Sequence, residues 1–289
     1  MKAIQLQNVT KKFGLVQALD NLNLEVDEGA FCGFIGPNGA GKSTSIRVLL
    51  NILYPTAGTA QIFGMDCTSQ SHEIKKITSY ASSDVRLYPK LTIHEIIKIV
   101  AEFRNLVNIQ DKLSHYYELF EMNPDKKIGT LSLGNKKKVA LVASLIASPK
   151  LLILDEPSNG LDPLMHHRFF SELQRLNASG TTIFLSSHDL KEVQNYCKNA
   201  IFIKDGKVVA IENIETERSG NKVLSISGSV DEESFVQIGC SILEKTEMKI
   251  RFLVRDRMEE VLRLLADQSI NDFEIKNLDL DEKFLALYR

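Results

Sequence analysis

The chain has 289 residues, a formal net charge of −2 and 25% charged residues. This length allows one large or two modest domains, and the near-neutral charge argues against nucleic-acid binding and against a charged disordered tail. Four scattered cysteines, Cys32, Cys67, Cys197 and Cys240, form no Cys-x-x-Cys pair. That pattern indicates reduced, partly buried thiols in a cytosolic protein. There is no signal-peptide pattern and no run of ~20 apolar residues, so any membrane span must come from another chain.

The first 63 residues predict four strands and a helix. Apolar and polar side chains alternate at residues 4–9 and again at 20–26, which predicts two half-buried strands. Such strands suggest an antiparallel edge beside a parallel core. Residues 30–35 are a short apolar run that predicts a buried strand, and apolar residues recur at helical spacing from 46 to 53. Residues 60–63 predict a further strand.

The loop between the third strand and the helix reads GPNGAGKS and fits the pattern G-x-x-x-x-G-K-[ST]. In such a loop, backbone N–H groups surround phosphate oxygens, the lysine reaches the outer phosphates and the hydroxyl binds Mg²⁺. The N-terminus of the following helix adds partial positive charge. A chance glycine-rich turn is the alternative, and the strand–loop–helix order argues against it. The predicted nucleotide contacts are Gly36, Pro37, Asn38, Gly39, Ala40, Gly41, Lys42, Ser43 and Thr44.

Residues 91–146 predict a helical insertion in the α/β core. Thr92 is in an N-cap position, with Glu95 at the capping-box position. Apolar residues between 96 and 103 then form one helical face, and residues 115–120 predict a second helix.

Two acidic residues end the next predicted strand. Residues 151–154 are all apolar, which indicates a central strand covered on both faces, and Asp155 and Glu156 follow. At the carboxyl end of a strand, Asp155 can hold Mg²⁺ and Glu156 can orient or deprotonate a water that attacks the γ-phosphate. A solvated strand end is the alternative for an isolated acid pair, but the upstream phosphate loop favours the functional interpretation.

The core is predicted to continue with a helix at 166–176, a strand at 182–185 and a helix at 190–196. Residues 200–203 and 208–211 flank an Asp-Gly pair and predict a hairpin.

A charged, turn-rich segment at 215–221 predicts a domain boundary. We therefore expect an α/β core domain at 1–213, with a mixed sheet and an antiparallel edge, and a small α+β domain at 222–289. The elements expected in the second domain are strands at 223–227, 248–254 and around 273–275, a helix carrying residues 258–265, and a final helix with Phe284, Leu285 and Tyr288.

Residues 131–135, LSLGN, lie upstream of the acid-ended strand and resemble the signature motif of ATP-binding-cassette (ABC) ATPases. Four other segments resemble further motifs of this family in the same order, over residues 1 to about 213. These are Phe13 ahead of Gly14 and Ala18-Leu19, where the family has an aromatic residue that stacks on adenine; residues 155–157, DEP; residues 158–162, SNGLD; and residues 186–189, SSHD.

The resemblance implies an ATPase that uses ATP and Mg²⁺ and acts as a head-to-tail dimer. Each ATP would lie between the phosphate loop of one subunit and the signature of the other. The implied roles are adenine contacts from Phe13 and Val16, catalysis by Glu156 and His188, metal binding by Ser43 and Asp155, γ-phosphate contacts in trans from Ser132, Gly134 and Asn135, and a dimer contact at Asp162. Taken alone, His188 is more often an ordinary hydrogen-bonded histidine.

The sequence departs from the family pattern in two places. Leu133 replaces the middle glycine of the common signature and Asn135 its glutamine. Ser83 aligns with a glutamine that contacts the metal, so either a water fills the gap, Asp84 substitutes, or the loop has lost the metal contact. Residues 136–138, KKK, indicate a solvated helix start, with anionic lipid as the alternative.

The leading hypothesis is the ATPase subunit of an ABC transporter, on the inner face of the cell membrane, that drives a separate membrane-spanning subunit. Residues 278–285, LDLDEKFL, resemble the tails of bacterial export subunits for drugs, antibiotic peptides or sodium. A soluble ABC ATPase of ribosomes or DNA is one alternative, and a sensor with a ligand-binding C-terminal domain is another. The partner ATPase could be a second copy or a paralogue.

Overall fold

A computed structural model of the protein describes residues 1–214, 221–228, 230–246, 248–255, 257–266, 268 and 270–277. The chain divides into two compact units, Met1–Ile211 and Glu212–Arg289. The turn-rich segment from residue 215 to 220 and the expected final helix with Phe284, Leu285 and Tyr288 lie outside the described residues.

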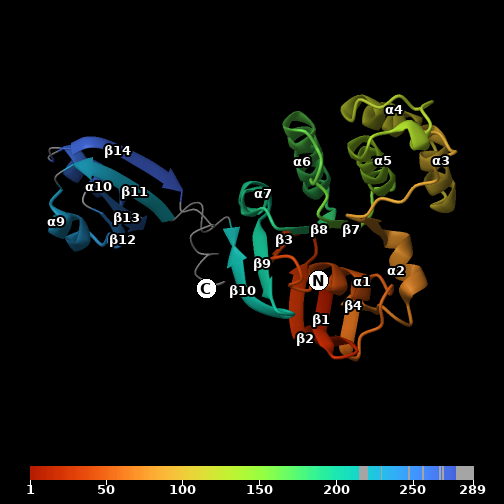
Figure 1. The fold of residues 1–289 in the computed structure, drawn as a ribbon, viewed down its shortest axis with the longest axis horizontal. Coiled ribbons are helices and arrows are strands. Elements are labelled where there is room, and N and C mark those ends of the chain that lie inside the picture. The colour runs from red at the N-terminus through yellow and green to blue at the C-terminus, as the bar shows by residue number, and fades with distance from the viewer. Residues whose placement is uncertain are drawn as a thin grey trace. The chain divides into compact units, whose positions relative to one another are not determined.

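A six-stranded sheet forms the centre of the first unit, in the order β10-β9-β3-β8-β7-β6 (Figure 1). Three adjacent strands inside it, β3, β8 and β7, are parallel and every residue in them is buried, as expected of strands covered on both faces. A two-residue turn, Asp205-Gly206, has positive φ at both residues (49° and 75°) and returns the chain as an antiparallel edge. The strands are β3 (Phe31–Ile35), β6 (Thr78–Ala81), β7 (Leu151–Asp155), β8 (Thr182–Ser187), β9 (Asn199–Lys204) and β10 (Lys207–Asn213).

The two early strands form an antiparallel sheet of their own, in the order β2-β1-β4-β5. Its strands are β1 (Lys2–Phe13), β2 (Val16–Asp27), β4 (Ala57–Ile62) and β5 (Met65–Asp66). Helix α1 (Lys42–Leu49) contacts both sheets (Figure 1). Its residue Ile46 is part of one core with Leu24 and Phe184. The helix was expected to continue to Leu53. It ends at Leu49 because Asn51 takes a left-handed conformation, common just after a helix end, while Leu53 packs on the core from the loop.

The helical insertion is present, and α3 packs on α5 (Figure 1). The expected capping box is confirmed, because Thr92 Oγ1 accepts a hydrogen bond from Glu95 N and Thr92 N donates to Glu95 Oε2. The helix expected at 115–120 begins earlier, at Gln110. The helices of the insertion are α3 (Ile93–Phe103), α4 (Gln110–Leu119) and α5 (Leu133–Leu145). A further helix, α2 (Ser71–Ile77), precedes β6 and was not predicted.

Two more helices complete the first unit, α6 (Pro163–Ala178) and α7 (Leu190–Tyr196). Phe170 of α6 stacks on Tyr196 of α7, with ring centroids 4.2 Å apart. The four cysteines are free thiols and buried, and burial raises the pKa of Cys32 to about 12. Among the described residues, no helix is long and apolar enough to cross a membrane.

The second unit is an α+β domain with an antiparallel sheet in the order β12-β13-β11-β14. The chain order β-α-β-β-α-β with this strand order is the ferredoxin-like arrangement. Phe235 stacks on Phe252 in its core, with centroids 5.0 Å apart. The elements are β11 (Asn221–Gly228), α9 (Glu232–Gln237), β12 (Ser241–Lys245), β13 (Lys249–Arg255), α10 (Met258–Ala266) and β14 (Ile270–Asn277), of which α9 and β12 were not predicted.

Candidate functional site

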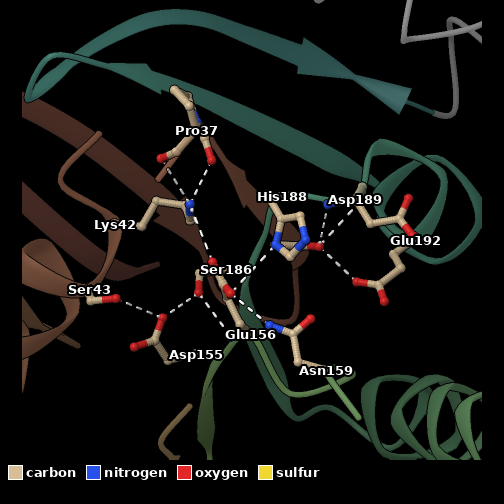
Figure 2. A network of polar contacts seen from close by, with 12 residues as sticks. Pro37, Lys42, Ser43, Asp155, Glu156, Asn159, Ser186, His188, Asp189 and Glu192 are labelled. Carbon is tan, nitrogen blue, oxygen red and sulfur yellow. Dashed lines mark hydrogen bonds and ion pairs between the residues drawn. The ribbon is translucent and has the colours of Figure 1, made fainter. Parts of the chain in front are cut away.

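The carboxyl ends of three neighbouring strands meet at one edge of the central sheet. Strand β3 leads into the phosphate loop, β7 ends at Asp155, and β8 ends at Ser187. Parallel pairing places Asp155 opposite Ser186 and Ile35 opposite Ser187. The polar side chains that follow these strands therefore form one connected network (Figure 2).

Lys42 lies at the centre of the phosphate loop. Its side chain is only 5% exposed, and Nζ donates hydrogen bonds to the carbonyl oxygens of Gly36 (2.6 Å) and Pro37 (3.2 Å) (Figure 2). Two glycines allow this conformation of the loop. Gly41 takes a φ of 109°, which residues with a Cβ rarely adopt, and Gly36 lies against the carbonyl oxygen of Ile203, where a Cβ would collide. Two main-chain carbonyl oxygens of the loop therefore hold the Lys42 ammonium group in place.

Asp155 is 1% exposed and its two oxygens differ. Oδ1 accepts hydrogen bonds from Ser186 Oγ (2.6 Å) and Ser43 Oγ (3.2 Å). Oδ2 is buried and has no hydrogen-bond partner among the described residues. A buried carboxylate oxygen without a partner, beside a hydroxyl, fits a hard cation that takes oxygen ligands, such as Mg²⁺.

Glu156 has an unusual backbone and a well-connected side chain. Its φ is 48°, in the left-handed region that residues other than glycine rarely adopt. Oε2 accepts a hydrogen bond from Asn159 Nδ2 at 2.8 Å and lies 3.5 Å from His188 Nδ1, and Oε1 lies 3.5 Å from Lys42 Nζ (Figure 2). The carboxylate is therefore held between the phosphate loop and the segment after β8. Asn159 was not singled out from the sequence.

The segment that carries His188 is fixed by a buried carboxylate on α7. Glu192 accepts a hydrogen bond from Ser187 Oγ at 2.7 Å, and its other oxygen lies 2.9 Å from His166 Nε2 on α6. Ser187 Oγ in turn accepts a hydrogen bond from Asp189 N at 2.9 Å. The backbone on either side of His188 is thus anchored, while the His188 side chain is 52% exposed.

Lys137 corrects the expectation that residues 136–138 are solvated. Its side chain is 5% exposed, and Nζ donates a hydrogen bond to the main-chain oxygen of Glu156 at 2.6 Å. Burial lowers the pKa of this ammonium, and the carboxylates of Glu156, Glu192 and Asp155 oppose that shift. The run of three lysines hid this residue, because only the tertiary structure turns one of the three toward the site.

The signature segment is at the surface. Ser132 caps α5 by accepting a hydrogen bond from Asn135 N at 3.3 Å, and the Leu133 side chain is 74% exposed. A Cβ on Gly134 would lie 3.0 Å from Gly160 O, so the glycine permits close packing against the loop before α6. Asp162 caps α6 by accepting from Met165 N at 2.9 Å, and this bond lowers the pKa of its carboxyl.

Three other predicted site residues lie away from the buried network. Phe13 and Val16 face each other at the exposed end of the β1–β2 hairpin. Ser83 is exposed in the loop after β6. The neighbouring Asp84 pairs with Arg86 Nε at 2.9 Å, so its carboxylate is already engaged on the surface.

Comparisons with known proteins agree with this arrangement. A family model described as ABC transporter matches residues 19–159. An uncharacterized ABC transporter ATP-binding protein of Bacillus subtilis is 30% identical over 98% of this chain and 97% of its own length. A bacitracin transport ATP-binding protein of Enterococcus faecalis is 31% identical over 88% of this chain and 82% of its own. Among solved structures, a dimeric ATP-binding cassette in a post-hydrolysis state with ADP and phosphate has a TM-score of 0.66, at 27% identity over 73% of this chain and 98% of that one.

Proposed function

The chain belongs to the family of ABC transporter ATP-binding proteins, and from that premise we propose that it binds and hydrolyses MgATP as the ATPase subunit of an exporter. The observation that carries the proposal is the single network joining Lys42, Ser43, Asp155 and Glu156 at the edge of the parallel sheet. Phosphoryl transfer to water needs positioning and neutralisation of charge, and this network supplies both. The predicted fold class is confirmed by the likeness to ABC cassettes.

The phosphate end of ATP would be held by the loop from Gly36 to Thr44. Lys42 would exchange its contacts with main-chain carbonyls for the outer phosphates. Ser43 and Asp155 would hold Mg²⁺, for which the unpartnered Oδ2 of Asp155 is the supporting observation. Bound Mg²⁺ neutralises charge on the phosphates. The exposed Phe13 ring would stack on adenine.

Glu156 would orient and deprotonate the attacking water. Asn159 and the backbone-anchored His188 fix the carboxylate from one side, and Lys42 lies on the other. A carboxylate held in this way keeps one geometry through the reaction, which favours catalysis because no reorganisation is needed. His188 would contact the γ-phosphate.

The second half of each ATP site would come from the signature of a partner ATPase subunit. Ser132, Leu133 and Asn135 are exposed at the start of α5, where main-chain N–H groups and the helix N-terminus favour an anion. Asp162 would lie in the dimer contact. ATP would thus bridge two subunits, and its hydrolysis would remove the bridge.

The membrane subunit would dock beside the loop that follows β6. A cavity of about 310 Å³ lies there, lined by Ser82, Val85, Leu87, Val100 and Ala140 among others. Since β6 is the neighbour of β7, a segment seated in this cavity is one strand away from Asp155. Export is supported by the names of the relatives and by residues 278–285, which lie outside the described residues. The protein would lie on the inner face of the cell membrane.

Purification from membranes tests the partnership. A tagged chain extracted from its native host in detergent should co-purify with a polytopic membrane protein, and Val85→Asp should reduce that recovery by placing a charge in the docking cavity. Val236→Asp, on the exposed face of α9 in the second unit, is the matched control. Recovery of the wild-type chain solely as a soluble homodimer would contradict the transporter role.

A further inference from the structure

Lys137 joins two parts of the chain that carry different halves of the ATPase machinery. It lies on α5, the helix that the signature residue Ser132 caps. Its Nζ donates to the main-chain oxygen of Glu156, at 2.6 Å, rather than to a side chain. A main-chain contact acts on the position of the whole residue, because the carbonyl and the side chain move together.

The backbone of Glu156 needs such support. A left-handed φ in a residue with a Cβ is costly and persists only where surrounding contacts hold it. On one side, Glu156 N donates to Ser186 O (3.1 Å) and to Ser186 Oγ (3.2 Å). Lys137 holds the other side, at the carbonyl. The residue is therefore fixed by β8 and by α5 together.

A lysine at this buried position is unfavourable for the stability of the fold. The ammonium is buried, and within the described residues no carboxylate forms a direct ion pair with Lys137. Although the carboxylates of Glu156, Glu192 and Asp155 favour its charge, a buried ammonium without a direct ion pair costs free energy that an apolar side chain of the same length would avoid. A strong, charge-assisted hydrogen bond to one defined oxygen is what a lysine adds here.

We propose that Lys137 is a positioning residue, which ties the catalytic glutamate to the signature helix of its own chain. The tie between Glu156 and α5 has a consequence for the dimer, and this consequence rests on the proposed function. The signature of one chain contacts the ATP held by its partner, whereas Glu156 acts on the ATP held by its own chain. A shift of α5 when the partner's site fills is transmitted through Lys137 to Glu156, so the two ATP sites of the dimer are coupled.

The test compares Lys137→Met, which removes the donor, with Lys137→Gln, which has similar length and keeps an N–H donor. Lys136→Met on the same helix is the control. In steady-state ATPase assays of the full chain, Lys137→Met should lower kcat about tenfold or more and leave the KM for ATP within about twofold, since the Lys137 side chain donates its hydrogen bond to Glu156 O and not to the phosphate loop. Lys137→Gln should recover part of the loss, and Lys136→Met should match the wild type.

A second measurement needs no ATP hydrolysis. Amide hydrogen exchange of the nucleotide-free protein should become about tenfold faster at residues 155–160 in Lys137→Met and stay unchanged elsewhere in β7 and α5. If the wild-type chain hydrolysed no ATP, the proposed function would fail, and the exchange measurement would still decide the role of Lys137.

Three results would overturn the proposal. One is wild-type kcat and wild-type exchange in Lys137→Met. Another is faster exchange throughout the first unit, which would make Lys137 a residue of the fold alone. The third is a raised KM with unchanged kcat, which would assign Lys137 to ATP binding. The coupling of the two ATP sites through Lys137 has its own test. An unchanged Hill coefficient for ATP hydrolysis in Lys137→Met would show that Lys137 does not couple the two sites.

Discussion

The two halves of the nucleotide site differ in how complete they are within one chain. In the half built on the phosphate loop, Lys42 and Asp155 are buried, Lys42 is hydrogen-bonded to carbonyl oxygens of the loop, and Asp155 is hydrogen-bonded to Ser186 of β8 and to Ser43 of α1. In the half built on the signature, Ser132 contacts its own helix and Leu133 extends into solvent. One half is organised by the fold, and the other is an exposed surface that would gain its contacts to ATP from the proposed partner.

This difference indicates which groups are ordered before ATP binds and which gain contacts only on dimerisation. Groups that must be in place before ATP arrives are positioned by folding, so ATP binding need not reorder them. In the proposed dimer, the signature surface would act on ATP only when a second subunit brings its ATP. In such a dimer, ATP would stabilise the closed pair of subunits far more than it stabilises the monomer, as an interfacial ligand should.

The largest expected effect is on the organised half. Glu156→Gln should slow hydrolysis by about 10²–10⁴-fold because the general base is lost, while ATP stays bound. The trapped dimer should then be visible by size-exclusion chromatography with ATP. Glu118→Gln, at an exposed position on α4, is the control and should leave the rate unchanged. Hydrolysis at the wild-type rate by Glu156→Gln would show that its assignment is wrong.

The next effect separates the two halves by mutation. Lys42→Ala should weaken ATP binding by the monomer, since the cation for the outer phosphates is removed. Gly134→Asp should leave that binding intact and abolish ATP-dependent dimerisation, because its carboxylate would face the partner's γ-phosphate and its Cβ would press on Gly160 O. Calorimetry with ATP and size-exclusion chromatography distinguish the two losses.

Mixing these two variants sharpens the comparison further. In a mixed dimer, the loop of the Gly134→Asp chain meets the signature of the Lys42→Ala chain, so one site has two intact halves. Phosphate release should therefore recover partly in the mixture, although each variant alone is inactive. Lack of recovery would mean that the partner is a paralogous ATPase subunit rather than a second copy.

The same division explains what the sequence could predict. The phosphate loop, Asp155, Glu156 and His188 lie in short segments whose residue types and spacing carry the chemistry, and the fold brings these segments to one sheet edge. Lys137 was missed because its role depends on which side of α5 faces Glu156, and no local pattern marks one lysine in a run of three. In the second unit, β12 was missed because all five of its residues are exposed, so it shows no alternation.

A smaller effect is expected at the surface half. Leu133→Gly should strengthen ATP-dependent dimerisation a few-fold, because an exposed leucine keeps the partner at a distance that glycine would not. ATP binding by the monomer should not change. Leu133→Ile keeps the bulk and is the control. Weaker dimerisation in the glycine variant would instead mean that the leucine contributes apolar contact at the interface.

The smallest effect is expected at Ser83, which belongs to neither half. Ser83→Gln should leave ATPase activity intact or raise it slightly, because the longer amide would extend toward the proposed metal site from the loop after β6, the strand beside β7. Complete loss of activity would mean that the loop is organised differently. Asp84→Asn separates the alternatives. If Asp84 substitutes at the metal, Asp84→Asn should lower the ATPase activity of the otherwise wild-type chain, and the same change should have no effect in the Ser83→Gln variant. We expect no loss of activity from Asp84→Asn, because the Asp84 carboxylate is already paired with Arg86 at 2.9 Å. A water would then lie between Ser83 and the metal.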